Sequence, residues 1–199
     1  LEDADAVTIE KDTAFPLTIL YALGRIDEIY ERLEVQSEID DQNISTAAFA
    51  AFISEVKGKS TAYNFCPKPI DFIDVSNIST HVKDLDNFIE DIIRELSEIQ
   101  TIWEPSGKST TSGFQSLLGT NLFERSSGKI EELRIIINHE LEKYYKKFQN
   151  ESCTYIQKWP YKKNLFAWHV VLSKQGYQSE HIHTSGWLSG VIYLKVVPP

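Results

Sequence analysis

The chain has 199 residues, of which 42% are hydrophobic and 25% are charged, and its net charge is −9 at pH 7. This length suits one large domain or a domain with an appendage, and the composition is that of an ordinary globular protein. The negative charge argues against a general nucleic-acid binder, because phosphate binding depends on clustered lysine and arginine. No apolar run in the sequence approaches the roughly 20 residues that cross a bilayer. We therefore expect neither a nucleic-acid partner nor a membrane span.

The two cysteines predict a reducing compartment. Cys66 and Cys153 lie far apart in the sequence, and neither belongs to a C-x-x-C pair. Unpaired thiols are typical of cytoplasmic proteins, so the expected location is the cytoplasm. The chain contains no methionine and begins at Leu1, which leaves open whether residues are missing from the sequence.

Residues 1–60 are predicted to be helical. Two sets of apolar side chains recur at helical spacing: first Leu17, Leu20, Tyr21, Leu23, Ile26, Ile29, Tyr30 and Leu33, then Phe49, Phe52, Ile53 and Val56. Ser45 and Thr46 precede the second set as candidate N-caps, and Gly58 marks its expected end. A helical repeat would leave the same pattern, but one pair of helices does not establish a stacked array. A repeat origin of this region stays an open alternative.

Residues 61–150 are predicted to be a linker and helices that support a β-domain. Prolines interrupt the first part, so we expect residues 61–80 to be irregular. One apolar face with helical period predicts a helix over residues 84–100, and a longer one predicts a helix over residues 129–149. Between these helices, a strand or extended segment is expected around residues 110–114.

Residues 151–199 change from a helical to a strand-like pattern. Strands are expected over residues 153–159, 164–172 and 188–197, with a turn at Gly176 between the last two. Helices first and strands after favour an α+β fold over an alternating βαβ arrangement.

Two histidines stand one residue apart just before the last apolar run. On a strand, residues i and i+2 point to the same face, so the imidazoles of His181 and His183 would face one point in space. Imidazole is a ligand of non-haem ferrous iron, and a triad of two histidines and one carboxylate leaves positions open on the ion. The spacing therefore predicts a metal site that contains both residues. Histidines on a solvent-facing strand edge are the alternative.

The segment Q-S-E-H-I-H-T-S-G-W-L-S-G-V-I-Y-L, from Gln178 to Leu194, resembles the iron-binding strand of the 2-oxoglutarate/Fe(II) dioxygenases. It is most similar to an oxygenase family that often carries tetratricopeptide repeats, with a motif close to H-I-H-P-x-x-W-L-S-G-V-Y-Y-L. Trp168 and the sequence Gly176-Tyr177-Gln178 are similar to preceding segments of that family. The resemblance implies Fe(II) and 2-oxoglutarate as cofactors. It also implies hydroxylation of an unknown acceptor, with release of succinate and CO2.

The resemblance implies roles for single residues. In the family an acidic ligand follows the first histidine by two positions, whereas here His183 takes that position. Three ligand sets stay open: both histidines, only one of them, or an added carboxylate such as Glu180. Tyr193 is similar to the tyrosine that commonly bonds the distal carboxylate of 2-oxoglutarate, and Gln178 is expected to line the pocket or to lie behind a ligating histidine. The distal histidine and the basic anchor of the cosubstrate would lie past Pro199.

The fold implied by the resemblance is α+β: a helical N-terminal region followed by the first part of a double-stranded β-helix, or jelly roll. Residues 151–199 would hold that first part, and the chain is expected to stop before the jelly roll is complete. Two other functions stay open. A cupin-like module would bind a metal or small ligand without redox turnover. A scaffold protein would bind a protein partner through the helical region, with a degenerate barrel behind it.

Overall fold

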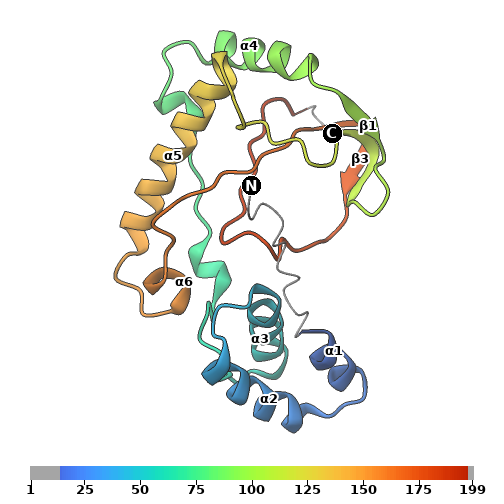
Figure 1. Cartoon of the computed structure of the whole chain (residues 1–199), viewed down its shortest axis with the longest axis vertical. Helices are drawn as coiled ribbons and strands as arrows, with labels where there is room; N and C mark the ends of the chain where they lie inside the picture. The colour runs from blue at the N-terminus through green and yellow to red at the C-terminus, as the bar shows by residue number, and fades with distance from the viewer. Residues whose placement is uncertain (1–13, 197–199) are drawn as a thin grey trace, which may run out of the picture. The chain divides into compact units, whose positions relative to one another are not determined.

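Three helices make up most of the first part of the chain in a computed structural model, which describes residues 14–196 (Figure 1). Within these residues the structure holds six α-helices and one three-stranded antiparallel sheet, which confirms the predicted α+β class. Its described residues divide into two units, which we treat separately. The first unit comprises residues 14–73, 148–159 and 184–188, and the second comprises residues 74–147, 160–183 and 189–196.

The first unit begins with α1 (Ala14–Ala22), α2 (Ile26–Ile39) and α3 (Ile44–Lys57). The apolar pattern that starts at Leu17 is therefore divided between two helices. Gly24 ends α1 in the left-handed region, with φ at +70°, and the N–H groups of Gly24 and Arg25 bond back to the carbonyls of Tyr21 and Leu20. These two bonds form a Schellman motif, which satisfies carbonyls that the end of a helix leaves unpaired.

A side chain caps the N-terminus of α3, and a glycine with a left-handed backbone ends its C-terminus. Asn43 accepts a hydrogen bond from the N–H of Thr46 at 2.9 Å, so the N-cap is Asn43 and the predicted caps at Ser45 and Thr46 are wrong. Gly58 ends the helix with a left-handed φ of +61°, as its sequence position predicted. The Tyr63 hydroxyl accepts from the Asn43 N–H and donates to the Asp40 carbonyl, which fixes the turn before α3.

Residues 153–159 do not form the predicted strand. They contain the short helix α6 (Thr154–Gln157), which belongs to the first unit. Tyr155 is buried and its ring contacts Phe65, Phe72 and Trp187. Aromatic and β-branched residues are enriched in strands because they pack well on half-buried surfaces, and here the same residues pack into an aromatic cluster. The strand-like composition of this segment therefore reflects its burial in the aromatic cluster and not a strand.

The second unit contains the two helices with the clearest sequence pattern. α4 (Leu85–Ser97) begins after Asp84, whose carboxylate accepts a hydrogen bond from the Asn87 N–H, and α5 (Gly128–Phe148) follows the sheet's first hairpin. Both predicted helices are confirmed. Phe88, Ile92, Leu133 and Ile136 form the apolar core between them. Two short 3-10 helices, η1 (Pro69–Phe72) in the first unit and η2 (Ile78–Thr80) in the second, lie in the otherwise irregular segment that the prolines predicted.

The sheet consists of β1 (Thr101–Trp103), β2 (Thr110–Ser116) and β3 (Val170–Gln178) in the order β1-β2-β3. Trp103 pairs with Phe114, and Phe114 pairs in turn with Val171. The strand expected around residues 110–114 is thus confirmed. Of the strand expected over residues 164–172, only the last three residues belong to β3.

The pairing of β2 with β3 is interrupted by a large bulge. Thr111 pairs with Tyr177 and Gly113 pairs with Leu172, so Ser112 alone faces the four residues 173–176. Ser112 and Gln175 both have a left-handed backbone, with φ values of +49° and +64°. The predicted turn at Gly176 is wrong, because β3 continues through this residue. The register nevertheless breaks there, as expected of a bulge that contains glycine.

Two further strand predictions are wrong. Residues 188–196 form no strand in the part of the chain that the structure describes, and neither do residues 179–183, which contain the histidine pair. Alternating β-branched residues favour a strand only when a neighbouring strand satisfies their backbone N–H and C=O groups. The described residues hold one sheet, so the double-stranded β-helix stays a prediction. Among the described helices, none is both long and apolar enough to span a bilayer.

Candidate metal centre

His181 and His183 lie in the loop that follows β3, in the second unit. Their ring centroids are 4.8 Å apart and the ring planes meet at 85°. An imidazole nitrogen about 2.1 Å from a metal ion puts its ring centroid roughly 3.2 Å from that ion, so two rings whose bonds to the ion meet at a right angle have centroids roughly 4.5 Å apart. The prediction that a strand face brings the two rings together is wrong. The loop brings them together instead, at a spacing that suits one shared ion.

The ring of His181 is oriented by the backbone. Its Nδ1 lies 2.7 Å from the carbonyl oxygen of Ser179, and a carbonyl can only accept, so Nδ1 carries the hydrogen. In the neutral ring Nε2 then keeps its lone pair for a ligand. Ser179 is itself held to the start of β2, because its N–H donates to the Ser109 carbonyl at 2.8 Å. Metal-binding histidines usually donate their second ring nitrogen to a carbonyl or carboxylate in this way.

The ring of His183 is half-buried against Trp168. The two ring centroids are 5.5 Å apart, with an angle of 55° between the planes. Within the described residues His183 forms no hydrogen bond, so neither ring nitrogen is engaged there. Burial lowers the pKa of His183 below its ordinary value of 6.5, and the positive charge that His181 gains on protonation lowers it further. Both causes favour the neutral ring, which is the form that binds metals.

The donor set fits a first-row divalent metal in kind, and it provides two protein ligands. Imidazole suits iron, copper, nickel and zinc. Among the described residues, Nε2 of His181 and both ring nitrogens of His183 form no hydrogen bond. No group of three His, Cys, Asp or Glu side chains within residues 14–196 is placed to hold a metal ion. Glu180, the carboxylate between β3 and His181, is exposed. Within the described residues, His181 and His183 are therefore the candidate ligands, without a third His, Cys, Asp or Glu beside them.

The two residues predicted to bind the cosubstrate lie in different surroundings. The side-chain amide of Gln178 donates to the Thr110 hydroxyl at 3.3 Å, and that hydroxyl donates to Gln115 at 2.8 Å. Thr110 and Gln115 are buried, so these hydrogen bonds hold the side chain of Gln178 against β2. Tyr193 is 74% exposed, and no hydrogen bond or ring contact within the described residues joins it to either histidine.

Sequence reasoning missed the groups that orient the two rings. The Ser179 carbonyl is a backbone atom, so no residue type reveals its role. Trp168 is visible in the sequence, but its position 15 residues before His183 gives no sign that the two rings touch. His169 is held by the sheet instead: its Nδ1 lies 2.8 Å from the hydroxyl of Ser116, and burial lowers its pKa. This environment supports a structural role for His169.

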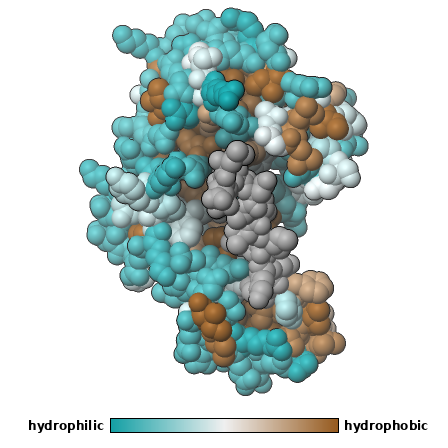
Figure 2. Space-filling view, viewed as in Figure 1, coloured by the Kyte–Doolittle hydropathy of each residue, from teal (hydrophilic) through white to brown (hydrophobic). Residues whose placement is uncertain are grey.

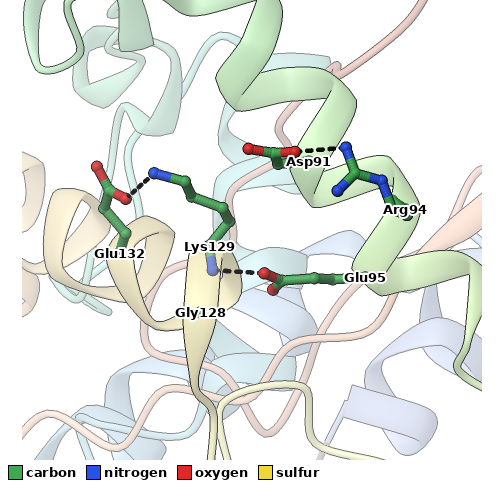
Figure 3. A pocket seen from close by; sticks show the side chains of 6 residues that line it. All are labelled: Asp91, Arg94, Glu95, Gly128, Lys129 and Glu132. Atoms are coloured by element: carbon green, nitrogen blue, oxygen red, sulfur yellow. Dashed lines mark hydrogen bonds and ion pairs between the residues drawn. The ribbon is translucent and has the colours of Figure 1, made fainter.

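A cavity of about 380 Å³ lies between α4 and α5, away from the histidine pair (Figure 3). Its charged side chains have partners already. Asp91 pairs with Arg94 at 2.5 Å, and Lys129 pairs with Glu132 at 2.6 Å. Glu95 accepts hydrogen bonds from the first N–H groups of α5. With these charges paired, the cavity marks the place where Glu95 caps α5.

One family matches the chain, by the description "Putative 2OG-Fe(II) oxygenase", over residues 166–199. The matched segment contains Trp168, Gln178, both histidines and Tyr193. No curated protein and no solved structure is significantly similar to the chain. The match supports an oxygenase function for which iron and 2-oxoglutarate are the implied cofactors, and it rests on a short stretch of sequence.

Proposed function

We propose that this protein is an Fe(II)- and 2-oxoglutarate-dependent oxygenase that hydroxylates an acceptor with release of succinate and CO2. One observation carries the proposal. Within the segment that matches the oxygenase family, the rings of His181 and His183 lie edge to face at a spacing that suits a shared ion. His181 has its Nδ1 engaged and its Nε2 free, and His183 has no hydrogen-bond partner among the described residues.

Both histidines hold the metal in this proposal. Dioxygen would be the oxidant, and bound ferrous iron would activate it while 2-oxoglutarate is oxidised to succinate and CO2; one oxygen atom would enter succinate and the other the acceptor. The contribution of the chain is to orient the two imidazoles. Tyr193 is proposed to bind the distal carboxylate of 2-oxoglutarate, and its place in the segment that matches the oxygenase family supports this role. The bond from Gln178 to Thr110 supports a role for Gln178 behind the loop that carries the histidines.

We also propose that the sheet β1-β2-β3 is part of a jelly roll. A jelly roll packs two sheets face to face, so each sheet has an apolar inner side. Trp103, Phe114 and Val171 form one cross-strand row, and all three are exposed large apolar side chains. An apolar row of this kind is what a second sheet would cover.

The helical region is proposed to bind a protein partner. Figure 2 shows apolar surface over the part of the molecule that holds α1, α2 and α3. The exposed apolar side chains of these helices are Phe15, Ile19, Val35, Ile39, Phe52 and Val56. Clustered exposed apolar side chains support a binding role, because such surfaces favour association. A cytoplasmic location is also proposed, and the two free cysteines support it.

An anaerobic titration of the full-length protein with Fe(II) and 2-oxoglutarate tests the proposal. The chelate of the two has a visible charge-transfer band, which we expect to appear on binding. His181→Ala and His183→Ala should each abolish the band. His139→Ala is the matched control, because His139 lies on α5 and its ring contacts His81 instead of the histidine pair. This control should leave the band unchanged.

Three results would contradict the proposal or its assigned ligands. A band that persists in both loop-histidine variants would contradict the assignment of His181 and His183, because the chelate would then form elsewhere. Absence of the band in the wild-type protein would exclude the chelate. Metal binding that depends on both histidines but never involves 2-oxoglutarate would favour the cupin-like binding module.

A further inference from the structure

The two histidines of the candidate metal centre are held in different ways. His181 is fixed by a hydrogen bond to the Ser179 carbonyl, whereas the contacts of His183 within the described residues are with rings. Residues 179–183 have no regular secondary structure, so strand or helix geometry does not restrict the side chain of His183. A metal ligand has to be held close to its productive geometry by packing or by hydrogen bonds. Trp168 is the residue placed to do this.

The backbone on both sides of Trp168 is held firmly. The Ala167 N–H donates to the side chain of Asn121 at 3.0 Å, and the Ala167 carbonyl accepts from the Leu122 N–H at 2.8 Å. On the other side, the N–H of His169 donates to the Ser116 hydroxyl at 3.0 Å, and the His169 carbonyl accepts from the Ser116 N–H at 3.1 Å. Four hydrogen bonds therefore fix the position from which the Trp168 side chain extends.

The indole ring is suited to support an imidazole. It lies 5.5 Å from the ring of His183 and 6.2 Å from the ring of Phe166, both within the usual range for aromatic pairs. Tryptophan has only two side-chain torsions, so it presents a large rigid surface at low conformational entropy cost. The indole nitrogen is a donor without a free lone pair, so Trp168 does not itself ligate a metal. Any influence on the metal has to pass through His183.

We propose that Trp168 is a positioning residue, which holds the imidazole of His183 in the orientation that binds the metal. This inference rests on the proposed metal site at His181 and His183. Trp168 and His183 thus act as a pair, in which a residue anchored to residues 116–122 restrains a ligand in an irregular loop. Groups that orient a metal ligand typically change metal affinity by about 10- to 100-fold when they are removed.

Binding of Co(II), a spectroscopic substitute for Fe(II), tests the inference on the full-length protein. Trp168→Leu should weaken Co(II) binding by about 10-fold and alter the visible ligand-field spectrum, since the ligand orientation changes. Trp168→Phe keeps an aromatic surface and should restore most of the affinity and the spectrum. Trp103→Leu is the matched control: Trp103 is also half-exposed in the second unit, but its ring contacts Phe114. Circular dichroism should show that all three variants are folded.

The inference is overturned if Trp168→Leu keeps the wild-type affinity and spectrum. It is also overturned if Trp103→Leu causes the same loss, because the effect would then be a general consequence of losing an indole. In both cases the proposed metal site survives, provided that His181→Ala and His183→Ala still weaken Co(II) binding. If wild-type protein binds Co(II) no better than these histidine variants, the metal site and the positioning role fail together.

Discussion

Glu95 caps the helix that begins at Gly128. Its carboxylate accepts hydrogen bonds from the N–H groups of Lys129 at 2.7 Å and Ile130 at 3.0 Å (Figure 3). A Cβ atom at Gly128 would collide with this carboxylate, and the φ of Gly128 is +58°. A negative charge at a helix N-terminus is favourable because the unpaired N–H groups there carry partial positive charge. A side chain of α4 thus completes α5 and links the two helices beside their shared core.

Removal of this cap should destabilise the protein. Glu95→Ala leaves two N–H groups of α5 without an acceptor, so we expect a loss of about 1–2 kcal/mol in the free energy of unfolding. Urea denaturation measures this change. Glu90→Ala is the matched control, because Glu90 is an exposed carboxylate on the same helix, and it should have little effect. Equal losses in the two variants would refute the capping role.

A side chain at Gly128 should interfere with the same cap. Gly128→Ala adds a Cβ atom in a left-handed conformation and pushes it against Glu95, so we expect a loss of more than about 1 kcal/mol. Combining it with Glu95→Ala removes the collision but not the backbone strain. In a double-mutant cycle by urea denaturation, the double variant should therefore lose less free energy of unfolding than the sum of the losses in the two single variants. Full additivity would mean that the two residues do not interact.

The β2–β3 bulge should tolerate no side chain at Gly176. A Cβ atom there would collide with the carbonyl oxygen of Ser112, which is backbone and cannot move away easily. Gly176→Ala is therefore expected to lower the free energy of unfolding by about 1–3 kcal/mol, measured by urea denaturation. Gly190→Ala provides the control, because a Cβ atom at Gly190 meets open space in the same unit. A mild effect at both positions would show that the bulge can rearrange.

The ion pairs of Glu140 should make stability depend on pH in the acid range. Lys143 at 2.8 Å is the largest cause that lowers the pKa of Glu140, to about 2 from an ordinary value of 4.5, and His81 at 2.6 Å also lowers it. Because the folded pKa is depressed, the stabilisation is fully present above pH 4.5 and is lost as the pH falls towards 2.

Glu140→Gln removes the titrating group and should flatten that dependence. We expect the free energy of unfolding of the variant to change less than that of the wild type between pH 4.5 and pH 2. Urea denaturation at a series of pH values measures this difference, with Glu90→Gln as the control. If Glu140→Gln and wild type lose stability in parallel over this range, the ion pairs of Glu140 contribute nothing to folding.

The helices of this protein were predictable from local sequence. Residues 84–100 and 129–149 repeat apolar side chains at helical period, and a helix satisfies its own backbone hydrogen bonds, so its pattern needs no distant partner. The same holds for the left-handed glycine at Gly58, whose conformation is a property of a single residue. The two histidines lie near each other because one residue separates them, but the contact between their rings depends on the loop conformation.

The strands and the supports of the candidate site depended on tertiary structure. A strand forms only where a second segment supplies its hydrogen bonds, so the apolar alternation of residues 188–197 was not sufficient, and residues 153–159 used similar side chains to build an aromatic core. The sequence by itself determined which donor atoms gather in the loop after β3. Only the tertiary structure decided that Trp168 lies against His183, because this contact requires the segment after β3 to fold back to the residues that precede β3. The bond from His181 to the Ser179 carbonyl spans two positions, and its geometry depends on the conformation of the loop.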